Sequence, residues 1–403
     1  MLLEDYLMLN FGSGKVYVRK DRISQIRRVD GIVFDCDGVL VDIRESYNKA
    51  ISKSASYILE GLTGHVIPES LISNEIIYLF RRTGGFNNDW DTVYGILMFT
   101  FSSLPKEIRK FLENMMEKIE RENSPFKRLM SIRDYTKRES KLRMLNDGFF
   151  VESIRKMKDF TKLLDSTGRR SVDKNLAEAF ESDEDFPRFY NLLRRFLHPA
   201  DDVRRSIIAR VFEEFFCGAN LFKEVYKVDL QFNKGPGLIE NERPIIRSET
   251  LDSLALILGE RNLGIASGSR IKIAEYPLGD LIGKFNPESV VFLEDVERAE
   301  REFSRREGRK ICLRKPHPFS LLKAAEGFRN SSLILYVGDS MEDAVMASEA
   351  AKLRGGFLFA GVYRYTGFEN NIIRSFLDYG CDMIIPSVNE LPAVLEMLRG
   401  RKE

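Results

Sequence analysis

The sequence lacks the features that mark secreted, membrane-spanning or zinc-binding proteins. It has four cysteines with no C-x-x-C pair among them, and only three histidines. The scattered cysteines argue against a disulfide framework and a structural zinc site, and three histidines exclude a His-rich metal site. No apolar run reaches the ~18 residues that a membrane span needs. We therefore expect a cytoplasmic protein with no membrane segment.

The sequence also has no large excess of charge of one sign, since its formal net charge is +1. A balanced chain has no global electrostatic attraction for nucleic acid or anionic membranes, so we expect neither as a partner. Glu4 and Asp5 stand where a signal peptide has basic residues. Glutamine is nearly absent while Lys, Arg and Glu abound, which is a bias seen in proteins from hot environments.

What the sequence does have is a regular alternation of strands and helices after about residue 248. Its 403 residues are enough for two domains, or for one domain with a large insertion. Alternation at this spacing predicts a three-layer α/β core, a Rossmann-like parallel sheet covered by helices on both faces. The predicted strands of that sheet are 31–35, 263–267, 289–295, 332–339, 355–362 and 382–386.

Between the first strand and the rest, strand signals vanish and helical patterns dominate. The sequence therefore predicts a core formed by 1–47 and 236–403, interrupted by an all-helical insertion over 48–235. The segment 237–246 is interpreted as the hinge through which the chain returns to the core, with a substrate role for Glu240 or Glu242 as the alternative.

Reactive side chains follow the predicted strands. Asp35 and Asp37 follow the first, and the pair Ser267-Gly268 follows the second. In an open parallel sheet, ligands bind at the carboxyl ends of the strands, so we expect these groups to meet.

Three more candidates belong to the same edge. Lys315 stands in "RKPHP" just ahead of a helix, Asp339 follows the strand "LILYVG", and Asp343 lies one helical turn later. Carboxylates at Asp35, Asp339 and Asp343 suit octahedral Mg²⁺. A lysine and a hydroxyl nearby can neutralise and orient a phosphoryl group, and a carboxyl not bound to metal can protonate a leaving oxygen.

In combination, these motifs resemble the haloacid dehalogenase (HAD) superfamily. The pattern is D-x-D-G-V-L-V-D, then Ser-Gly, then Lys-Pro, then G-D-S-x-x-D, over residues 30–47 and 236–403. The insertion after the first motif is similar to the helical cap of the phosphoglycolate-phosphatase-like branch. It is more than twice the usual size of such a cap, so about 100 residues are not explained by the resemblance.

The resemblance implies a role for each matching residue. Asp35 would be the nucleophile that forms an aspartyl-phosphate, and Asp37 the general acid and base. Ser267 and Lys315 would hold the phosphoryl oxygens, beside the backbone of Gly268. Magnesium would be held by Asp35, Asp339, Asp343 and the backbone carbonyl of Asp37. Because dehalogenase members lack the second carboxylate and transport ATPases have threonine there, Asp37 favours a phosphatase or phosphotransferase.

Within the insertion, "RRTGGFNNDWDTVYGILMF" (81–99) is the most distinctive segment. It is interpreted either as a helix N-cap with a core tryptophan, Trp90, or as a cap loop that directs Arg82, Asn88 or Asp89 at a substrate.

Polar groups near the motifs of the core have simpler interpretations. Cys36 is expected to be a buried strand residue, Asp42 to cap the following turn, and His317 to be a loop residue.

The sequence therefore predicts a Mg²⁺-dependent phosphatase acting on a small phosphorylated metabolite. A first alternative is a phosphotransferase or mutase of the β-phosphoglucomutase type, which would pass the phosphoryl group to a sugar hydroxyl. A second is a binding protein whose enlarged cap engages a macromolecular partner.

Overall fold

The computed structural model describes residues 3–86, 88–136, 142, 145–329 and 331–400. The chain divides into two compact units, one formed by Met1–Arg44 with Asn241–Glu403 and one by Glu45–Glu240. They are called here the core unit and the helical unit. These limits differ by three to five residues from the division expected from the sequence.

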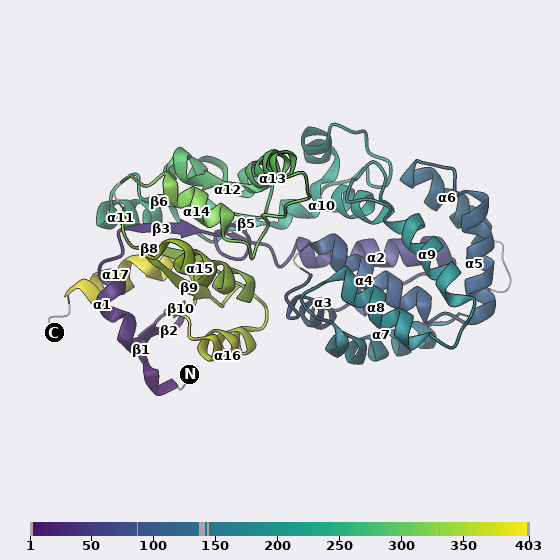
Figure 1. The fold of residues 1–403 in the computed structure, drawn as a ribbon, viewed down its shortest axis with the longest axis horizontal. Helices are drawn as coiled ribbons and strands as arrows, with labels where there is room; N and C mark the ends of the chain where they lie inside the picture. The colour runs from purple at the N-terminus through teal and green to yellow at the C-terminus, as the bar shows by residue number, and fades with distance from the viewer. Residues whose placement is uncertain (1–2, 87, 137–141, 143–144, 330, 401–403) are drawn as a thin grey trace. The chain divides into compact units, whose positions relative to one another are not determined.

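The core unit is built on a mostly parallel sheet of eight strands (Figure 1). The strand order is β1-β2-β10-β9-β8-β3-β6-β7. The strands are β1 (Tyr6–Phe11), β2 (Gly14–Arg19), β3 (Gly31–Phe34), β6 (Leu263–Ala266), β7 (Val290–Val291), β8 (Ile334–Gly338), β9 (Phe357–Val362) and β10 (Met383–Ile385). All six predicted strands are therefore present, although the third of them, expected over 289–295, is only two residues long.

The central strands are apolar throughout because both faces of the sheet are covered. Every residue of β3 is buried, and successive side chains enter opposite cores: Ile32 and Phe34 pack on one side and Val33 on the other. This buried environment is what makes polar groups at the strand ends costly unless they are paired.

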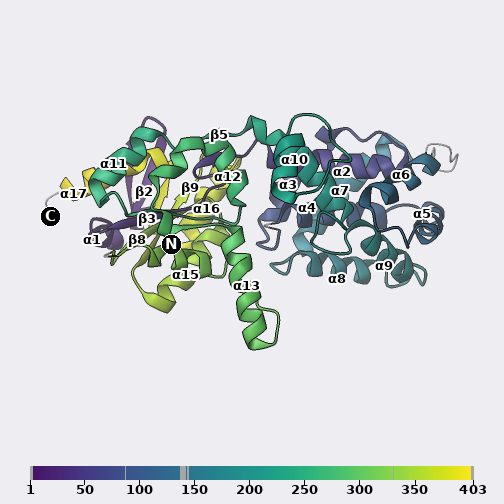
Figure 2. The ribbon, with the colours of Figure 1, turned by 90° about the horizontal axis from the view of Figure 1, so that it is seen from above.

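Helices form the two outer layers of the core unit (Figures 1 and 2). On one face lie α1 (Ile23–Ile26), α11 (Ser248–Leu258), α12 (Ile271–Leu278) and α17 (Leu391–Gly400). On the other lie α13 (Leu293–Glu307), α14 (Phe319–Glu326), α15 (Met341–Arg354) and α16 (Glu369–Tyr379). The three-layer α/β architecture is confirmed.

Two features of the core unit were not predicted. The N-terminal segment forms an antiparallel hairpin, β1–β2, that extends the sheet through β10. Separately, β4 (Val41–Asp42) pairs with β5 (Arg243–Pro244), with Asp42 opposite Arg243. This short ladder ties the strand leaving the core unit to the strand entering it.

The helical unit contains no strand among its described residues. Its helix α2 contacts α4, α6 and α10, so it forms the centre of the unit. The helices are α2 (Tyr47–Thr63), α3 (Asn74–Arg81), α4 (Asp89–Ser102), α5 (Lys106–Lys118), α6 (Pro125–Thr136), α7 (Asp147–Phe160), α8 (Arg169–Ala179), α9 (Phe186–Leu197) and α10 (Ile207–Tyr226).

A buried carboxylate fixes the segment that follows α10. Glu214 accepts hydrogen bonds from the backbone N–H groups of Gln231, Phe232 and Asn233, at 2.5–3.0 Å. The Arg210 guanidinium also donates to Glu214, and neither side chain of this ion pair is more than 2% exposed. Glu214 thus takes the place of a strand or helix partner for three consecutive backbone donors.

None of the helices described in either unit combines the length and the hydropathy needed to cross a membrane.

Candidate active site

Asp35 lies directly after the central strand β3, between β8 and β6. Its backbone N–H donates to the carbonyl of Val337 in β8 at 2.8 Å, which continues the parallel ladder by one residue. Ser267 follows β6 and Asp339 follows β8. The carboxyl ends of three adjacent strands thus bring these three side chains to one edge of the sheet, as expected for a ligand site.

Lys315 reaches this edge from the loop ahead of α14. Its ammonium lies 2.8 Å from Oδ1 of Asp35 and 2.8 Å from Oδ1 of Asp343. The Lys315–Pro316 peptide bond is cis. Burial alone would lower the pKa of Lys315, but the two carboxylates outweigh it and hold that pKa well above its ordinary value. Lys315 therefore carries a fixed positive charge at the strand ends.

The Asp343 carboxylate accepts hydrogen bonds from other groups of the protein. Oδ1 accepts from Lys315 and from the Tyr336 hydroxyl, both at 2.8 Å. Oδ2 accepts from the Ser340 hydroxyl at 2.6 Å and the Ser340 backbone N–H at 3.2 Å. Burial would raise the pKa of Asp343, but these donors, Lys315 first, hold it below its usual range. Asp343 is thus suited to orienting Lys315.

For Asp35 and Asp339, unlike Asp343, the influences that raise the pKa outweigh those that lower it. Burial, together with the neighbouring carboxylates, raises the pKa of Asp35 to about 7 despite the adjacent Lys315. Burial and the charges of Asp343 and Asp35 also raise the pKa of Asp339 well above its usual range. One lysine therefore does not compensate the negative charge gathered at this edge.

A divalent cation fits this imbalance. Carboxylate oxygens of Asp35, Asp339 and Asp343 all lie within 4.8 Å of one another. Among the described residues, Asp339 has no hydrogen-bonding or ion-pair partner, so its oxygens are available to a metal. Gly38, with φ of 72°, makes this arrangement possible because a Cβ there would overlap the Asp339 carboxylate. The donor set is all oxygen, as Mg²⁺ prefers.

Asp37 follows Asp35 by two residues but has a hydrogen-bonding partner of its own. Its Oδ2 accepts a hydrogen bond from the hydroxyl of Ser269, and Asp37 is partly exposed whereas Asp35 is buried. A carboxyl with a hydroxyl partner and access to solvent can exchange a proton with a bound molecule.

Ser267 and Gly268 provide neutral groups at the end of β6. Ser267 is buried, and its Oγ accepts from the backbone N–H of Ser269 at 3.1 Å, which fixes the turn. Gly268 is exposed, and no atom of another residue lies within 4 Å of where its Cβ would be. The open space above Gly268 lets a ligand approach the backbone closely.

Sequence reasoning missed three side chains that the structure adds to this site. Ser269 contacts Asp37, while Tyr336 and Ser340 contact Asp343. Tyr336 gave a signal, since it is the one side chain with a hydroxyl inside the apolar run "LILYVG". Ser340 was visible as a helix N-cap, because it precedes α15 with an acidic residue three positions later.

The two predicted substrate residues of the insertion lie in the helical unit. Asn88 is the N-cap of α4, where its side chain accepts from the backbone N–H of Trp90 at 3.0 Å. Arg82 is exposed at the end of α3. Asp89 forms an ion pair with Arg81 at 2.7 Å, and Trp90 donates to Glu213 at 2.9 Å. The capping interpretation of this segment therefore matches the observed contacts of Asn88.

The other polar groups near the motifs have ordinary structural partners. Cys36 is fully buried, and its carbonyl accepts from the turn that follows. Asp42 binds the Arg44 guanidinium through two hydrogen bonds, at 2.9 and 2.7 Å. His317 accepts from the backbone N–H of Phe319 at 3.2 Å, at the start of α14.

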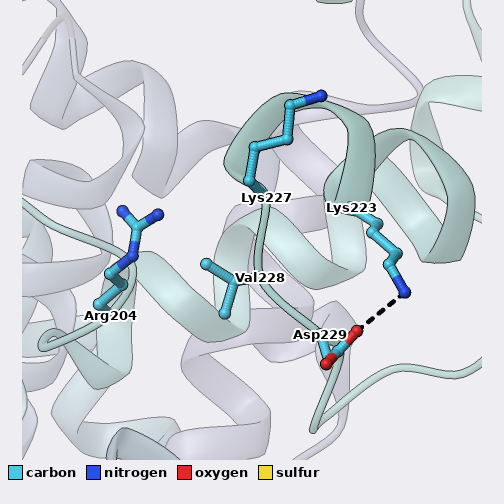
Figure 3. A pocket seen from close by; sticks show the side chains of 5 residues that line it. All are labelled: Arg204, Lys223, Lys227, Val228 and Asp229. Atoms are coloured by element: carbon cyan, nitrogen blue, oxygen red, sulfur yellow. Dashed lines mark ion pairs between the residues drawn. The ribbon is translucent and has the colours of Figure 1, made fainter.

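Two further groupings in the helical unit contain none of the predicted residues. Figure 3 shows a pocket of about 630 Å³ lined by Arg204, Lys223, Lys227, Val228 and Asp229, in which Lys223 pairs with Asp229 at 3.0 Å. Elsewhere Asp91, His198 and Asp201 converge, but Arg169 lies 3.0 Å from each carboxylate and already supplies a cation.

Comparison with known proteins assigns the family. A family model for a hydrolase, described as haloacid dehalogenase-like hydrolase, matches residues 29–351. The chain belongs to the haloacid dehalogenase-like hydrolases. The match spans both the motifs of the core unit and the helical insertion between them, and it makes the protein a hydrolytic enzyme.

Two solved structures are similar to this haloacid dehalogenase-like chain. One is an X-ray structure of a Northeast Structural Genomics Consortium target, 19% identical, with a TM-score of 0.62 over 92% of this chain and 99% of that chain. The other is phosphatase Tt82 from Thermococcus thioreducens, 22% identical, with a TM-score of 0.46 over 85% of this chain and 98% of that chain. The first supports the fold. No curated protein matches the sequence.

Proposed function

We propose that the protein is a Mg²⁺-dependent phosphatase that hydrolyses the phosphate monoester of a small metabolite through an aspartyl-phosphate on Asp35. One observation carries the proposal: the Asp35 carboxylate lies 2.8 Å from the Lys315 ammonium, while Asp37, two residues later, has a separate hydroxyl partner. The pair therefore offers one carboxylate beside a positive charge and a second that is available for proton transfer.

In the first step an oxygen of Asp35 attacks phosphorus. A new oxygen–phosphorus bond forms as the ester oxygen–phosphorus bond breaks, and Asp37 gives its proton to the leaving oxygen. The Lys315 ammonium, the Ser267 hydroxyl and the Gly268 backbone N–H hold the phosphoryl oxygens. The Ser269 hydroxyl keeps the Asp37 carboxyl in place during this transfer.

In the second step Asp37, now a carboxylate, takes a proton from water. The resulting hydroxide attacks phosphorus, the bond to Asp35 breaks, and inorganic phosphate leaves. Each residue thus returns to its starting protonation state, and the net reaction is hydrolysis of one ester bond.

Magnesium would be held by Asp35, Asp339 and the backbone carbonyl of Asp37, with Asp343 binding it directly or through water. When bound, the cation neutralises charge on the phosphoryl oxygens. Asp343 contributes mainly by orienting Lys315, since its oxygens already accept from four donors. Together, these groups must supply roughly 20 kcal/mol, because phosphate monoesters hydrolyse extremely slowly in water.

We assign the helical unit the role of a cap that admits a small substrate and excludes water from it. Arg82, which is exposed, and Asn88 are the residues of 81–99 proposed to face the substrate. The cytoplasm is the compartment proposed for this reaction, since the four cysteines are scattered along the chain with no C-x-x-C pair.

The experiment that tests the proposal is a screen of phosphorylated metabolites and p-nitrophenyl phosphate with Mg²⁺. Wild type should release phosphate with no sugar acceptor present, which separates a hydrolase from a phosphotransferase. Asp35→Asn should abolish release, and Asp37→Asn should reduce it by about 10²-fold or more. Asp378→Asn removes an exposed carboxylate of the same unit and is the matched control.

The proposal is wrong if wild type releases phosphate from none of these compounds, or if Asp35→Asn keeps its activity. Activity that vanishes in Asp35→Asn also rules out a purely binding role for the enlarged cap.

A further inference from the structure

A second pocket in the core unit has no part in the mechanism above. It has a volume of about 300 Å³ and is lined by Ser13, Arg247, Arg364, Tyr365, Ser387, Asn389 and Glu390. We call it the edge pocket. Two arginines and three hydroxyl groups in so small a space are the kind of lining that recognises an anion.

The edge pocket lies at the same edge of the sheet as Asp35. Arg364 follows the end of β9 by two residues, and Ser387 follows the end of β10 by two residues. Ser13 belongs to the turn between β1 and β2, and β2 runs antiparallel to β10, which brings this turn to the carboxyl end of β10. The pocket is therefore formed where parallel α/β sheets bind their ligands.

The backbone of both arginines is held in place. The N–H of Arg247 donates to Oδ1 of Asn389 at 3.1 Å, and Asn389 is itself fixed by its own donation to the Ile245 carbonyl at 2.7 Å. The N–H of Arg364 donates to the Pro386 carbonyl at 3.3 Å, and its guanidinium donates to the Ser13 carbonyl. The Arg364 guanidinium is thus positioned before an anion binds, which reduces the entropy lost on binding, while Arg247 is fixed through its backbone.

The charge of the edge pocket is positive. Among the residues that the structure describes, neither Arg247 nor Arg364 forms an ion pair with a carboxylate. Glu390 is the one acidic residue in the lining, and it accepts a hydrogen bond from the Ser13 hydroxyl. The adjacent Arg44 is paired with Asp42, so this pair adds little net charge. Helix α11 starts directly after Arg247 and adds the partial positive charge of its N-terminus.

We propose that the edge pocket binds a second anionic group, a phosphate or carboxylate, of the substrate whose phosphoryl group is attacked by Asp35. The inference rests on the proposed function and adds a substrate class to it: elongated bis-anionic phosphate esters. Arg247 and Arg364 bind the distant anion, and the Ser387 and Ser13 hydroxyls lie beside it.

Strand geometry gives the length of such a substrate. Two strand spacings separate β3 from β9, with β8 between them, and a third leads to β10. Neighbouring strands lie about 4.8 Å apart, so the two anions would be about 10–15 Å from each other. A short phosphorylated acid does not reach that far, whereas an extended bisphosphate does.

The test uses synthetic substrates of graded length. Alkanediol bisphosphates with a short, a medium and a long chain are each compared with the monophosphate of the same diol, and kcat/KM is measured with Mg²⁺. Wild type should prefer the bisphosphate over its monophosphate, and the preference should rise once the chain spans the two sites. In Arg247→Gln and Arg364→Gln the preference should fall about tenfold or more for each arginine removed.

Two comparisons separate charge from structure. Arg247→Lys and Arg364→Lys should recover part of the preference, because a cation is retained. Arg301→Gln removes an exposed arginine of α13 and should leave the preference unchanged. The inference fails if wild type shows no preference at any length, or if the glutamine variants lose equal activity on both members of each pair.

A second readout does not depend on turnover. Phenylglyoxal modification of Arg247 and Arg364, followed by mass spectrometry, should be slowed by the long bisphosphate and not by its monophosphate, with Arg301 as the internal reference. If no phosphate ester is hydrolysed, the proposed function fails, and this protection alone decides whether the edge pocket binds an anion. Equal modification with and without bisphosphate overturns the inference.

Discussion

At the scale of single residues, the site is a set of four carboxylates with different partners. Asp35 lies beside Lys315, Asp343 accepts from four donors, Asp339 has no partner among the described residues, and Asp37 accepts from Ser269. These partners, rather than the carboxyl groups themselves, distinguish the roles of nucleophile, anchor, metal ligand and acid that we propose for them.

Tyr336→Phe tests the anchoring role. Loss of the hydroxyl removes one of the two hydrogen bonds to Oδ1 of Asp343, so Lys315 should be held less firmly. A hydrogen bond to a charged group contributes about 1.5–3 kcal/mol, and we expect kcat/KM for p-nitrophenyl phosphate to fall about tenfold or more.

Tyr190→Phe is the matched control for that variant. Tyr190 also donates to a carboxylate, Asp173, at 2.7 Å, but it lies in the helical unit. Both variants should lose comparable stability in thermal denaturation, and only Tyr336→Phe should lose activity. Equal activity in the two would remove Tyr336 from the site.

Much of the residue-level site could be predicted because reactive groups at strand ends interrupt apolar runs. Asp35, Ser267 and Asp339 are visible in this way, and the structure brings them to one edge. Among the partners, Ser340 could be predicted from the N-cap pattern that it forms with Asp343, but Ser269 and Tyr336 could not. Nothing in the sequence says that Tyr336 points toward Asp343, since the pairing depends on how β8 lies against the start of α15.

At the scale of elements, turns decide whether the carboxylates can meet. Gly38 lies in the turn after β3 with φ of 72°, and a Cβ there would overlap the Asp339 carboxylate. Gly38→Ala should therefore displace Asp339 and lower the Mg²⁺-dependent activity by about 10²-fold, with a loss of stability of about 1–3 kcal/mol.

Gly308→Ala isolates the backbone contribution. Gly308 ends α13 with φ of 67°, but no atom lies within 4 Å of its Cβ position. The two variants share the strain of a positive φ, and only Gly38→Ala adds the overlap. Activity measured against Mg²⁺ concentration should change in Gly38→Ala alone; an equal change in both would show that strain is the cause.

Glu214→Ala tests the segment that returns from α10. The substitution leaves three backbone N–H groups without their acceptor and removes the carboxylate partner of the buried Arg210, which keeps only the Asp229 carbonyl. Such a loss costs about 3–5 kcal/mol, and limited proteolysis should cut within 228–236.

Glu60→Ala removes a carboxylate that is paired with Arg133 and is 32% exposed, so it should cost less than about 1 kcal/mol. A Glu214 variant that resists proteolysis as well as the Glu60 variant does would contradict this role.

The elements themselves were predictable where periodicity was strong. The buried strands and the helical insertion follow from continuous apolar runs and from helical spacing. The β1–β2 hairpin was missed, although Gly12-Ser13-Gly14 marks a turn and the buried Val16 and Val18 alternate with half-buried or exposed residues. The segment 289–295 was read as one strand, but Phe292 and Asp295 form the capping interactions that start α13.

At the scale of the whole molecule, we expect the free energy of unfolding to depend on pH and on Mg²⁺ because of the acidic cluster. In the folded protein the pKa of Asp35 is raised to about 7, whereas in the unfolded chain it is near 4. Folding therefore favours the protonated form of Asp35. Its contribution to the free energy of unfolding is fully present below about pH 4 and is lost as the pH rises toward 7.

Magnesium should reverse that loss, because it binds the deprotonated carboxylates. We expect Mg²⁺ to raise Tm by more at pH 8 than at pH 5, relative to protein in EDTA. Scanning calorimetry at both pH values measures the increment, and Asp35→Asn should reduce it. An increment that is the same at both pH values, or unchanged in Asp35→Asn, would contradict a metal site at this edge.

The β4–β5 ladder has a consequence for how such a protein can be rebuilt. Val41 pairs with Pro244 and Asp42 with Arg243, so the chain leaves and re-enters the core unit through neighbouring strands about 5 Å apart. A gap that short can be closed by a tight turn or by any insert whose own ends are adjacent. The helical unit is therefore exchangeable in principle: a graft at 44 and 241 could replace it with another module while leaving the order of the sheet strands untouched.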